Sequence, residues 1–227
     1  MTSKFKKIKV KICCIKSKKE AQIAYKYGAS SIGLVSKMPS GPGIISDSLI
    51  NKIVNSSPTG LETTLLTCYT SPNKIINQHK KAKTNNIQLV KKIDIDNYGL
   101  IKKALPYTKL IQVIHITDKD IIKNAIKISK HVDYLLLDTG SFINKEELGG
   151  TGKVHDWNIS KIIRNSVKIP VILAGGLNHR NVNKAIEKIM PFGVDVCSGV
   201  RTNDKLDLFK LKEFFNSLSL KKPLIKS

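Results

Sequence analysis

Residues 135–200 carry the sequence pattern that best indicates the architecture of the chain. They contain LLLDTG (135–140), GGTGKVHDW (149–157), IPVILAGGLN (169–178) and FGVDVCSGV (192–200). Three of these segments carry an apolar run that ends at a polar or glycine-bearing turn, and a helix-like pattern follows each turn. The runs close at Asp138, at Gly175 and Gly176, and at Ser198 and Gly199. The carboxyl ends of parallel strands meet at one rim, so this order predicts a (β/α)8 barrel whose rim binds a phosphorylated small molecule.

Strand patterns and helix patterns alternate along the whole chain. The short strand patterns are rich in Val, Ile and Leu and cover 8–13, 30–35, 61–67, 86–90, 109–114, 132–137, 169–174 and 193–197. The helix patterns cover 17–27, 46–55, 72–84, 94–104, 118–130, 157–166, 178–189 and 205–218, with Ser17 and Asp118 as expected capping residues.

No linker or break in composition divides this alternation. We therefore expect the α/β class and a single (β/α)8 TIM barrel domain over residues 1–227, with 221–227 a loose tail. The turn after the first strand pattern contains no glycine, which disfavours an open dinucleotide-binding sheet.

The charge balance is strongly basic, with 39 Lys and Arg residues against 17 Asp and Glu and a net charge of +22. Lysine makes up almost all of the basic residues and is spread over nearly every segment, which is typical of a solvated surface. Nucleic-acid binding is therefore disfavoured. The chain has no apolar run of membrane-spanning length and no signal-peptide core, and its cysteines show no disulfide framework, so we expect a reduced, cytoplasmic protein with no membrane partner.

Two candidate proton-transfer groups fall at predicted strand ends. Asp138 follows three leucines, and a carboxyl group beside an apolar layer suits a general acid, although the same residue also suits a turn cap. Cys13 closes KIC, and Lys11 is expected on the same face of the strand, where its charge favours a thiolate. A small buried hydrophobic residue is the alternative for Cys13, and Cys14 is expected to face the helices.

Paired glycine turns provide the candidate phosphate site. Backbone N–H groups at Gly175, Gly176, Ser198 and Gly199 follow the seventh and eighth strand patterns, where barrels commonly bind phosphate. The GGTG segment at 149–152 is expected to close over the substrate. The spacing of Cys13, Cys68, Cys197 and His115 matches no usual zinc signature, so we expect no metal.

Taken together, KVKIC (9–13), LLLDTG, GGTGKVHDW, PVILAGGLN and GVDVCSGVR resemble the phosphoribosylanthranilate isomerase family over essentially the whole chain. The resemblance implies an Amadori rearrangement of N-(5-phosphoribosyl)anthranilate to the aminoketose in tryptophan biosynthesis, without cofactor. It implies Cys13 as the general base, Asp138 as the general acid, phosphate binding by Gly175, Gly176, Ser198 and Gly199, and substrate binding by Asp156. It is compatible with a monomer or a homodimer.

Three positions differ from the family pattern. KICG is KICC here, so Cys14 replaces a glycine; Gly43 stands where an arginine that holds the anthranilate carboxylate is expected; and QLHG is QLVK. Lys37 or Lys91 is then the expected carboxylate anchor. Two alternatives stay open: a barrel isomerase or lyase for another sugar phosphate, and a non-catalytic barrel that binds RNA through its lysines.

Overall fold

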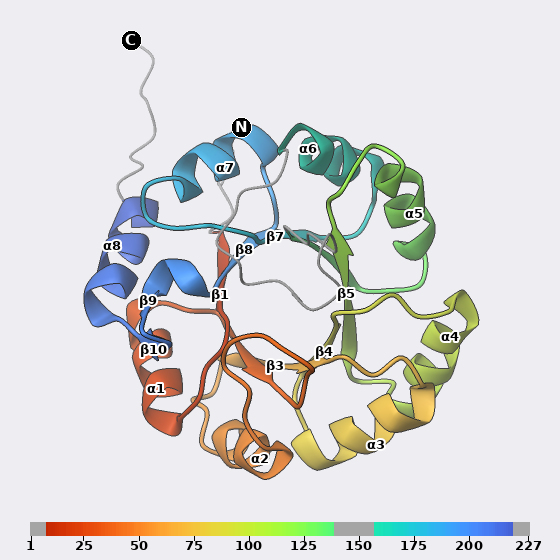
Figure 1. The fold of residues 1–227 in the computed structure, drawn as a ribbon, viewed down its shortest axis with the longest axis horizontal. Helices are drawn as coiled ribbons and strands as arrows, with labels where there is room; N and C mark the ends of the chain where they lie inside the picture. The colour runs from red at the N-terminus through yellow and green to blue at the C-terminus, as the bar shows by residue number, and fades with distance from the viewer. Residues whose placement is uncertain (1–7, 139–156, 220–227) are drawn as a thin grey trace.

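The computed structural model describes residues 8–138 and 157–219, and in this part of the chain eight parallel strands close into a barrel (Figure 1). Each strand pairs with the next, and the last closes on the first, with Ile12 opposite Val196. The strands are β1 (Lys9–Ile12), β2 (Ser31–Val35), β3 (Glu62–Thr67), β4 (Asn86–Leu89), β5 (Lys109–His115), β6 (Tyr134–Asp138), β7 (Val171–Leu173) and β8 (Gly193–Val196). The predicted (β/α)8 barrel is confirmed.

A ring of helices surrounds the barrel (Figure 1). These are α1 (Lys18–Tyr27), α2 (Asp47–Asn55), α3 (Pro72–Ala82), α4 (Ile95–Ala104), α5 (Ile121–Ile128), α6 (Trp157–Ser166), α7 (Val182–Ile189) and α8 (Leu208–Ser219). A short 3-10 helix, η1 (Ser198–Val200), and a small hairpin of β9 (Arg201–Thr202) and β10 (Lys205–Leu206) separate β8 from α8. None of the described helices is long and apolar enough to cross a membrane.

Local hydrogen bonds explain where the helices begin. The predicted cap at Ser17 is confirmed, because its Oγ accepts the Glu20 N–H at 3.1 Å. The predicted cap at Asp118 is wrong: its Oδ1 accepts the Asp120 N–H at 2.9 Å, and α5 begins after this turn. Asn178 likewise accepts the N–H of Arg180 at 2.9 Å, and α7 begins after residue 178, where we expected its start. Short polar side chains of this kind favour turns over helix.

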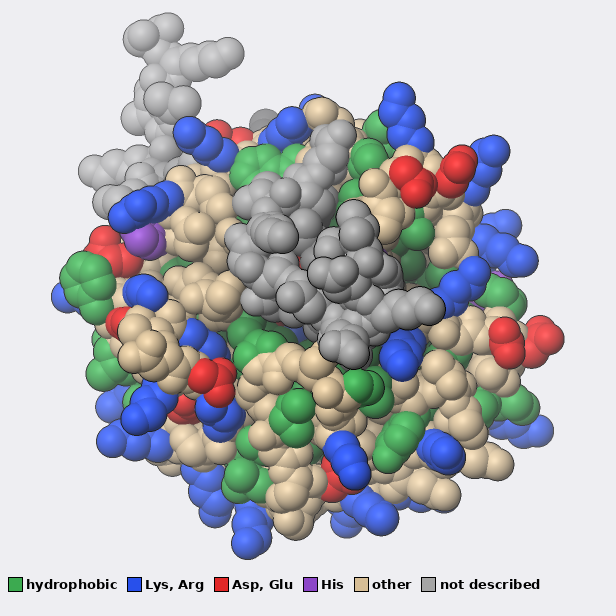
Figure 2. Space-filling model, viewed as in Figure 1, with side chains coloured by type: hydrophobic (Ala, Val, Ile, Leu, Met, Phe, Trp, Pro, Cys, Tyr) green, Lys and Arg blue, Asp and Glu red, His purple; other side chains and the backbone are tan. Residues whose placement is uncertain are grey.

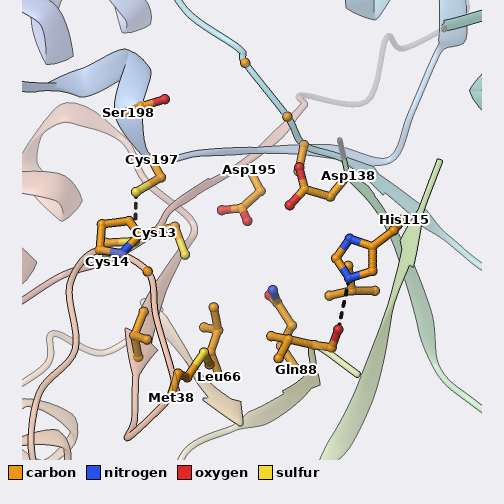
Figure 3. A pocket seen from close by; sticks show the side chains of 18 of the residues that line it. Cys13, Cys14, Met38, Leu66, Gln88, His115, Asp138, Asp195, Cys197 and Ser198 are labelled. Carbon is orange, nitrogen blue, oxygen red and sulfur yellow. Dashed lines mark hydrogen bonds between the residues drawn. The ribbon is translucent and has the colours of Figure 1, made fainter. Parts of the chain in front are cut away.

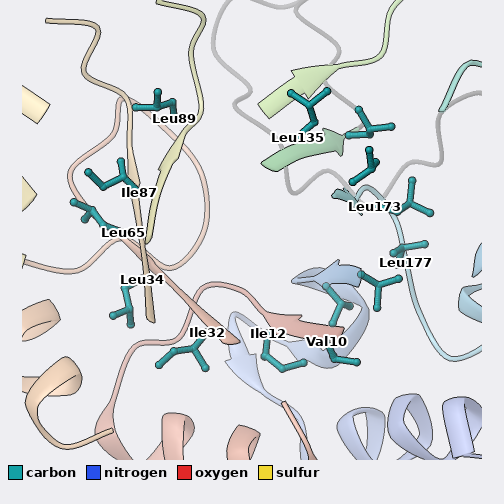
Figure 4. Close-up of a cluster of buried hydrophobic side chains, with 14 of the residues drawn as sticks. Val10, Ile12, Ile32, Leu34, Leu65, Ile87, Leu89, Leu135, Leu173 and Leu177 are labelled. Atoms are coloured by element: carbon teal, nitrogen blue, oxygen red, sulfur yellow. The ribbon is translucent and has the colours of Figure 1, made fainter. Parts of the chain in front are cut away.

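Side chains alternate between two apolar layers. Outward-facing side chains of the strands pack against the helices, among them Val10, Ile12, Ile32, Leu34, Leu65, Ile87, Leu89, Leu135 and Leu173 (Figure 4). A second cluster faces the barrel interior and includes Val35, Leu66, Ile111, Val113, Leu136 and Ile172. The interior also holds buried polar side chains, notably Lys11, Gln88 and Asp195. Buried polar and charged side chains normally have a partner or take part in function. These residues therefore indicate that a functional site lies on the barrel axis.

Candidate active site

A pocket opens at the carboxyl ends of the strands (Figure 3). It holds about 740 Å³ of space that no atom occupies, including open solvent at its mouth. Its polar and glycine lining residues include Cys13, Cys14, Gln88, His115, Asp138, Gly175, Gly176, Asp195, Cys197 and Ser198, and its apolar ones include Val35, Leu66, Val90, Val113 and Ala174. Predicted residues from β1, β6, β7 and β8 are therefore brought together in one cavity.

A buried ion pair lies beneath Cys13. Lys11 Nζ is 2.8 Å from Asp195 Oδ2, and both side chains are less than a tenth exposed. The same ammonium lies 3.6 Å from Cys13 Sγ, which confirms that Lys11 and Cys13 share a face of β1. Burial alone would lower the pKa of Lys11, but attraction by Asp195 and by Cys13 outweighs it, so the pKa is raised and Lys11 stays charged. A fixed positive charge therefore sits beside the thiol.

The pKa values of the two adjacent cysteines are shifted in opposite directions. A hydrogen bond from the Cys14 side chain lowers the pKa of Cys13; burial opposes this effect, and the Lys11 charge adds to it. The net shift in the pKa of Cys13 is downward. The pKa of Cys14 is raised well above its usual value by hydrogen bonding to Cys13 and Cys197 and by burial. Cys13 is thus the thiol that ionises first, as a base requires.

Cys14 also lines the pocket, so the expectation that it faces the helices is wrong. Its φ of 63° places it in the left-handed region, and this turn of the backbone ends the strict alternation of β1. Gly43 lies directly against it: a β-carbon at position 43 would be 2.5 Å from Cys14 Cβ, and φ at Gly43 is 77°. An arginine at position 43 would therefore collide with Cys14, so the two departures from the family pattern are in direct contact.

Room for the Cys13 thiol comes from Gly33 on β2. A β-carbon at this position would lie 2.7 Å from Cys13 Sγ. Real side chains do not approach so closely, so the sulfur occupies the space that the glycine leaves open.

Arg201 fixes the backbone of the cysteine pair. Its guanidinium donates to the carbonyl oxygens of both Cys13 and Cys14 and pairs with Glu20 at 3.2 Å. The Arg201 side chain is only 4% exposed, so these bonds are made away from water. Planar guanidinium groups suit such multiple contacts better than ammonium groups do.

Asp138 and His115 stand at another side of the pocket (Figure 3). The two residues are register partners at the ends of β6 and β5. The ring of His115 is oriented by a 3.0 Å hydrogen bond between Nε2 and the carbonyl oxygen of Val90. Asp195 lies between Asp138 and the cysteines in the same view.

The two glycine-bearing turns touch each other. Gly175 and Gly176 have φ of 85° and 62°, and both line the pocket, as does Ser198. Gly199 is not a lining residue, but a β-carbon there would lie 2.0 Å from the carbonyl oxygen of Leu177. A side chain at position 199 would thus force the turns after β7 and β8 apart.

Some expectations have no counterpart in the described pocket. Lys37 and Lys91 do not line it, and its described lining contains no Lys or Arg. Asp156 and the GGTG segment at 149–152 lie outside the described residues. In the described ranges, no group of three or more His, Cys, Asp or Glu side chains is arranged to hold a metal ion.

Sequence reasoning missed Asp195 and did not assign a role to Gln88. Both are buried polar residues inside apolar strands, GVDVC and NIQLV. A charged residue at an inward position of an otherwise apolar strand is the signal that identifies Asp195.

Figure 2 shows Lys and Arg side chains scattered around the viewed face, not gathered in one patch. This distribution resembles the solvated surface that the composition indicates.

The barrel and its rim pocket define an enzyme of the (β/α)8 class that acts on a small molecule. The family model for N-(5'-phosphoribosyl)anthranilate (PRA) isomerase matches residues 10–217. The chain therefore belongs to the PRA isomerase family, an isomerase family of tryptophan biosynthesis whose members convert an aldose-type substrate to a ketose.

Individual relatives agree over nearly their full length. The chain is 33% identical over 215 residues to the N-(5'-phosphoribosyl)anthranilate isomerase of Methanocella arvoryzae, which covers 94% of this chain and 99% of that protein. It is 34% identical over 211 residues to the enzyme of Bacillus mycoides, covering 91% and 96%. The crystal structure of phosphoribosyl anthranilate isomerase from Thermotoga maritima superposes with a TM-score of 0.80 at 28% identity, covering 93% of this chain and 98% of that one.

Proposed function

We propose that the chain converts N-(5-phosphoribosyl)anthranilate to its aminoketose by an Amadori rearrangement, with Cys13 as general base and Asp138 as general acid. The observation that carries this proposal is the shared pocket. A thiol beside a buried ammonium and a carboxyl group line one cavity, together with two glycine turns. Membership of the family supports the proposed class of substrate, and the lining of the pocket supports the proposed roles of the residues.

The first proton transfer opens the ribose ring. Asp138 gives a proton to the ring oxygen, the bond from this oxygen to C1 breaks, and the anthranilate nitrogen supplies electrons to form the iminium. Asp138 suits this role because it ends β6 at the pocket rim, in register with His115. Positioned acids of this kind contribute about 10²–10⁴-fold to rate.

The second proton transfer moves the double bond. The Cys13 thiolate removes the proton at C2, the electrons neutralise the iminium as an enolamine, and tautomerisation gives the ketose. Lys11, 3.6 Å from the sulfur, favours the thiolate, and Asp195 holds Lys11 in place. The proton taken by Cys13 and the proton lost by Asp138 balance over the cycle, so the enzyme is returned unchanged.

We assign the phosphate to the turns after β7 and β8. Gly175, Gly176, Ser198 and Gly199 supply backbone N–H groups and a hydroxyl group there, and their packing keeps the two turns together. Backbone donors bind phosphate without a lysine or arginine side chain. Asp156 remains our candidate for a further substrate contact.

Complementation tests the proposed reaction. A tryptophan-requiring strain that lacks this isomerase should grow when it expresses the chain, and should not grow with Cys13→Ser or Asp138→Asn. The variant Cys68→Ser is the matched control, because Cys68 does not line the pocket. Failure of soluble, well-expressed wild-type protein would argue for a different sugar phosphate, which calorimetric titration with simple sugar phosphates and an anthranilate-bearing analogue would identify.

A further inference from the structure

A second pair of thiols lies at the pocket wall, and the proposed reaction does not use it. Cys14 Sγ and Cys197 Sγ are 2.7 Å apart, although the residues are 183 positions apart in sequence (Figure 3). A disulfide bond is about 2.05 Å long, so bond formation needs the sulfur atoms to approach by less than about 1 Å. Cys14 is buried, and Cys197 is partly exposed at the pocket.

The backbones that carry these thiols are already fixed against each other. Cys13 N donates to the carbonyl oxygen of Val196 at 2.9 Å, which continues the β1–β8 ladder up to the two cysteines. Arg201, four positions after Cys197, donates to the carbonyl oxygen of Cys14. A bond between the two sulfur atoms would therefore join segments whose relative placement is set by hydrogen bonds.

The third nearby thiol is differently engaged. Cys13 Sγ is held by the Lys11 ammonium and fills the space beside Gly33. The geometry therefore favours Cys14 and Cys197 over either pairing that includes Cys13.

We propose that Cys14 and Cys197 are an oxidative modification site, at which a hydroperoxide forms a reversible disulfide that switches off the Cys13 base. The disulfide stands on the geometry alone, and the effect on activity rests on the proposed function. With hydrogen peroxide, the more exposed Cys197 thiolate attacks one oxygen atom, the O–O bond breaks, and the sulfur becomes a sulfenic acid. The hydroxide that leaves takes up the proton that Cys197 had lost and becomes the first water. Cys14 then attacks that sulfur, the S–S bond forms, and the second water leaves with its proton. The two thiols together lose two electrons, which reduce the peroxide, and a dithiol reverses the change by exchange.

The effect on the base follows from one hydrogen bond. In the reduced protein, the Cys14 thiol donates to Cys13 and lowers the pKa of the Cys13 thiol. A disulfide sulfur has no proton to donate, so oxidation removes this stabilisation of the thiolate. The pKa of the Cys13 thiol therefore rises on oxidation, and a smaller fraction of the base is thiolate near neutral pH. We expect kcat/KM near neutral pH to fall about tenfold on oxidation.

Peptide mapping tests the disulfide without reference to activity. Wild-type protein is treated with one equivalent of hydrogen peroxide, blocked with an alkylating reagent and digested with trypsin without reduction. The expected product joins Ile12–Lys16 to Ile189–Arg201, and dithiothreitol should separate it. Cys13→Ser should keep this product, whereas Cys14→Ser and Cys197→Ser should lose it. Loss of the product in Cys13→Ser, or its absence from wild type, overturns the proposal.

An activity assay on the same samples tests the switch. The measure is the ratio of kcat/KM after oxidation to kcat/KM before it, so a changed basal activity in a variant does not matter. This ratio should be about one tenth in wild type and in the control Cys68→Ser, and dithiothreitol should return it to about one. It should stay near one in Cys14→Ser and Cys197→Ser. An equal loss in Cys14→Ser would mean that Cys13 itself is oxidised, and would contradict the switch. If no sample isomerises the substrate while the peptide product forms as expected, the proposed function fails and the disulfide stands.

Discussion

Gly43 and Cys14 are matched to each other: a β-carbon at position 43 would lie 2.5 Å from the Cys14 β-carbon. One residue belongs to the loop after β2 and the other to the loop after β1. Both differ from the pattern of the family to which the chain belongs, and the contact gives a physical reason. The backbone of residue 14 adds to this contact, because its Cα and carbonyl oxygen would lie 2.9 and 3.1 Å from the same β-carbon, so position 43 requires glycine.

The first prediction concerns this contact. Gly43→Ala should destabilise the protein by about 1–3 kcal/mol, because it adds a clash to an unfavourable positive φ. In a Cys14→Gly background the same substitution should cost less, since the 2.5 Å contact with the Cys14 β-carbon is gone, while the contacts with Cα and the carbonyl oxygen of residue 14, at 2.9 and 3.1 Å, and the φ penalty remain. Urea denaturation of the two single variants and the double variant measures this coupling. Simple additivity would show that the two residues do not interact.

Removal of the Lys11 charge should shift the pH dependence of catalysis. Lys11 lowers the pKa of the Cys13 thiol, so Lys11→Met should raise it and move the lower limb of the kcat/KM profile to higher pH. The single variant leaves Asp195 buried and unpaired, at a cost of about 3–5 kcal/mol.

The double variant Lys11→Met with Asp195→Leu removes both charges and separates stability from catalysis. It should recover much of the stability and still show a raised pKa of the base, by less than Lys11→Met alone, because Asp195 itself raises the pKa of Cys13 and Lys11 has the larger effect. A profile that stays at the wild-type position in a folded variant would exclude Lys11 as the group that activates Cys13.

Arg201 is expected to act on Cys13 by positioning it. Arg201→Met loses the bonds to two carbonyl oxygens and removes the positive charge that pairs with Glu20, which should cost about 3 kcal/mol in stability. It should also lower kcat more than it raises KM, because the base is displaced while the phosphate turns are intact. Alkylation of Cys13 by iodoacetamide reports its environment directly. Glu20→Gln is the matched control, since it weakens the ion pair and keeps both carbonyl contacts.

His79 makes stability depend on pH. Burial lowers its pKa, and the 2.7 Å hydrogen bond to the carbonyl oxygen of Thr84 only partly opposes this shift. As the pH falls, His79 is therefore protonated in the unfolded chain before it is protonated in the folded one. Its contribution to the unfolding free energy is fully present above about pH 6.5 and is lost as the pH drops below this value. Urea denaturation at about pH 8 and about pH 5.5 should show this decrease in wild type and a smaller one in His79→Gln. An equal decrease in the unfolding free energy of wild type and His79→Gln would assign the pH dependence of stability to other groups.

Much of the fold is visible in the sequence because each βα unit carries its own signals. Short apolar runs predict the strands, and their order places Asp138 and the glycine turns at one rim before any coordinates are known. The confirmed cap at Ser17 is equally local, since it depends on residues three positions apart. The helix starts predicted at Asp118 and Asn178 are wrong because Asp and Asn side chains stabilise turns as well as the first turn of a helix.

The details of the site depend on contacts that no local pattern contains. Lys11 meets Asp195 across the closure of the barrel, 184 positions away in sequence. Cys14 faces the pocket because its backbone is left-handed, which strand alternation does not predict for a residue other than glycine. The fit of Cys13 against Gly33 likewise becomes visible only when neighbouring strands are in register.

In the proposed mechanism, Cys13 and Asp138 exchange protons with a substrate that is held elsewhere by its phosphate. The most direct measurement combines steady-state turnover of N-(5-phosphoribosyl)anthranilate with calorimetric binding of inorganic phosphate, in wild type, Cys13→Ser, Asp138→Asn and Cys68→Ser. We expect Cys13→Ser and Asp138→Asn to lose at least about 100-fold in kcat/KM and to keep the phosphate affinity of wild type, while Cys68→Ser retains both. Turnover close to wild type in Cys13→Ser or Asp138→Asn, or loss of phosphate affinity in either, would contradict the roles assigned to them.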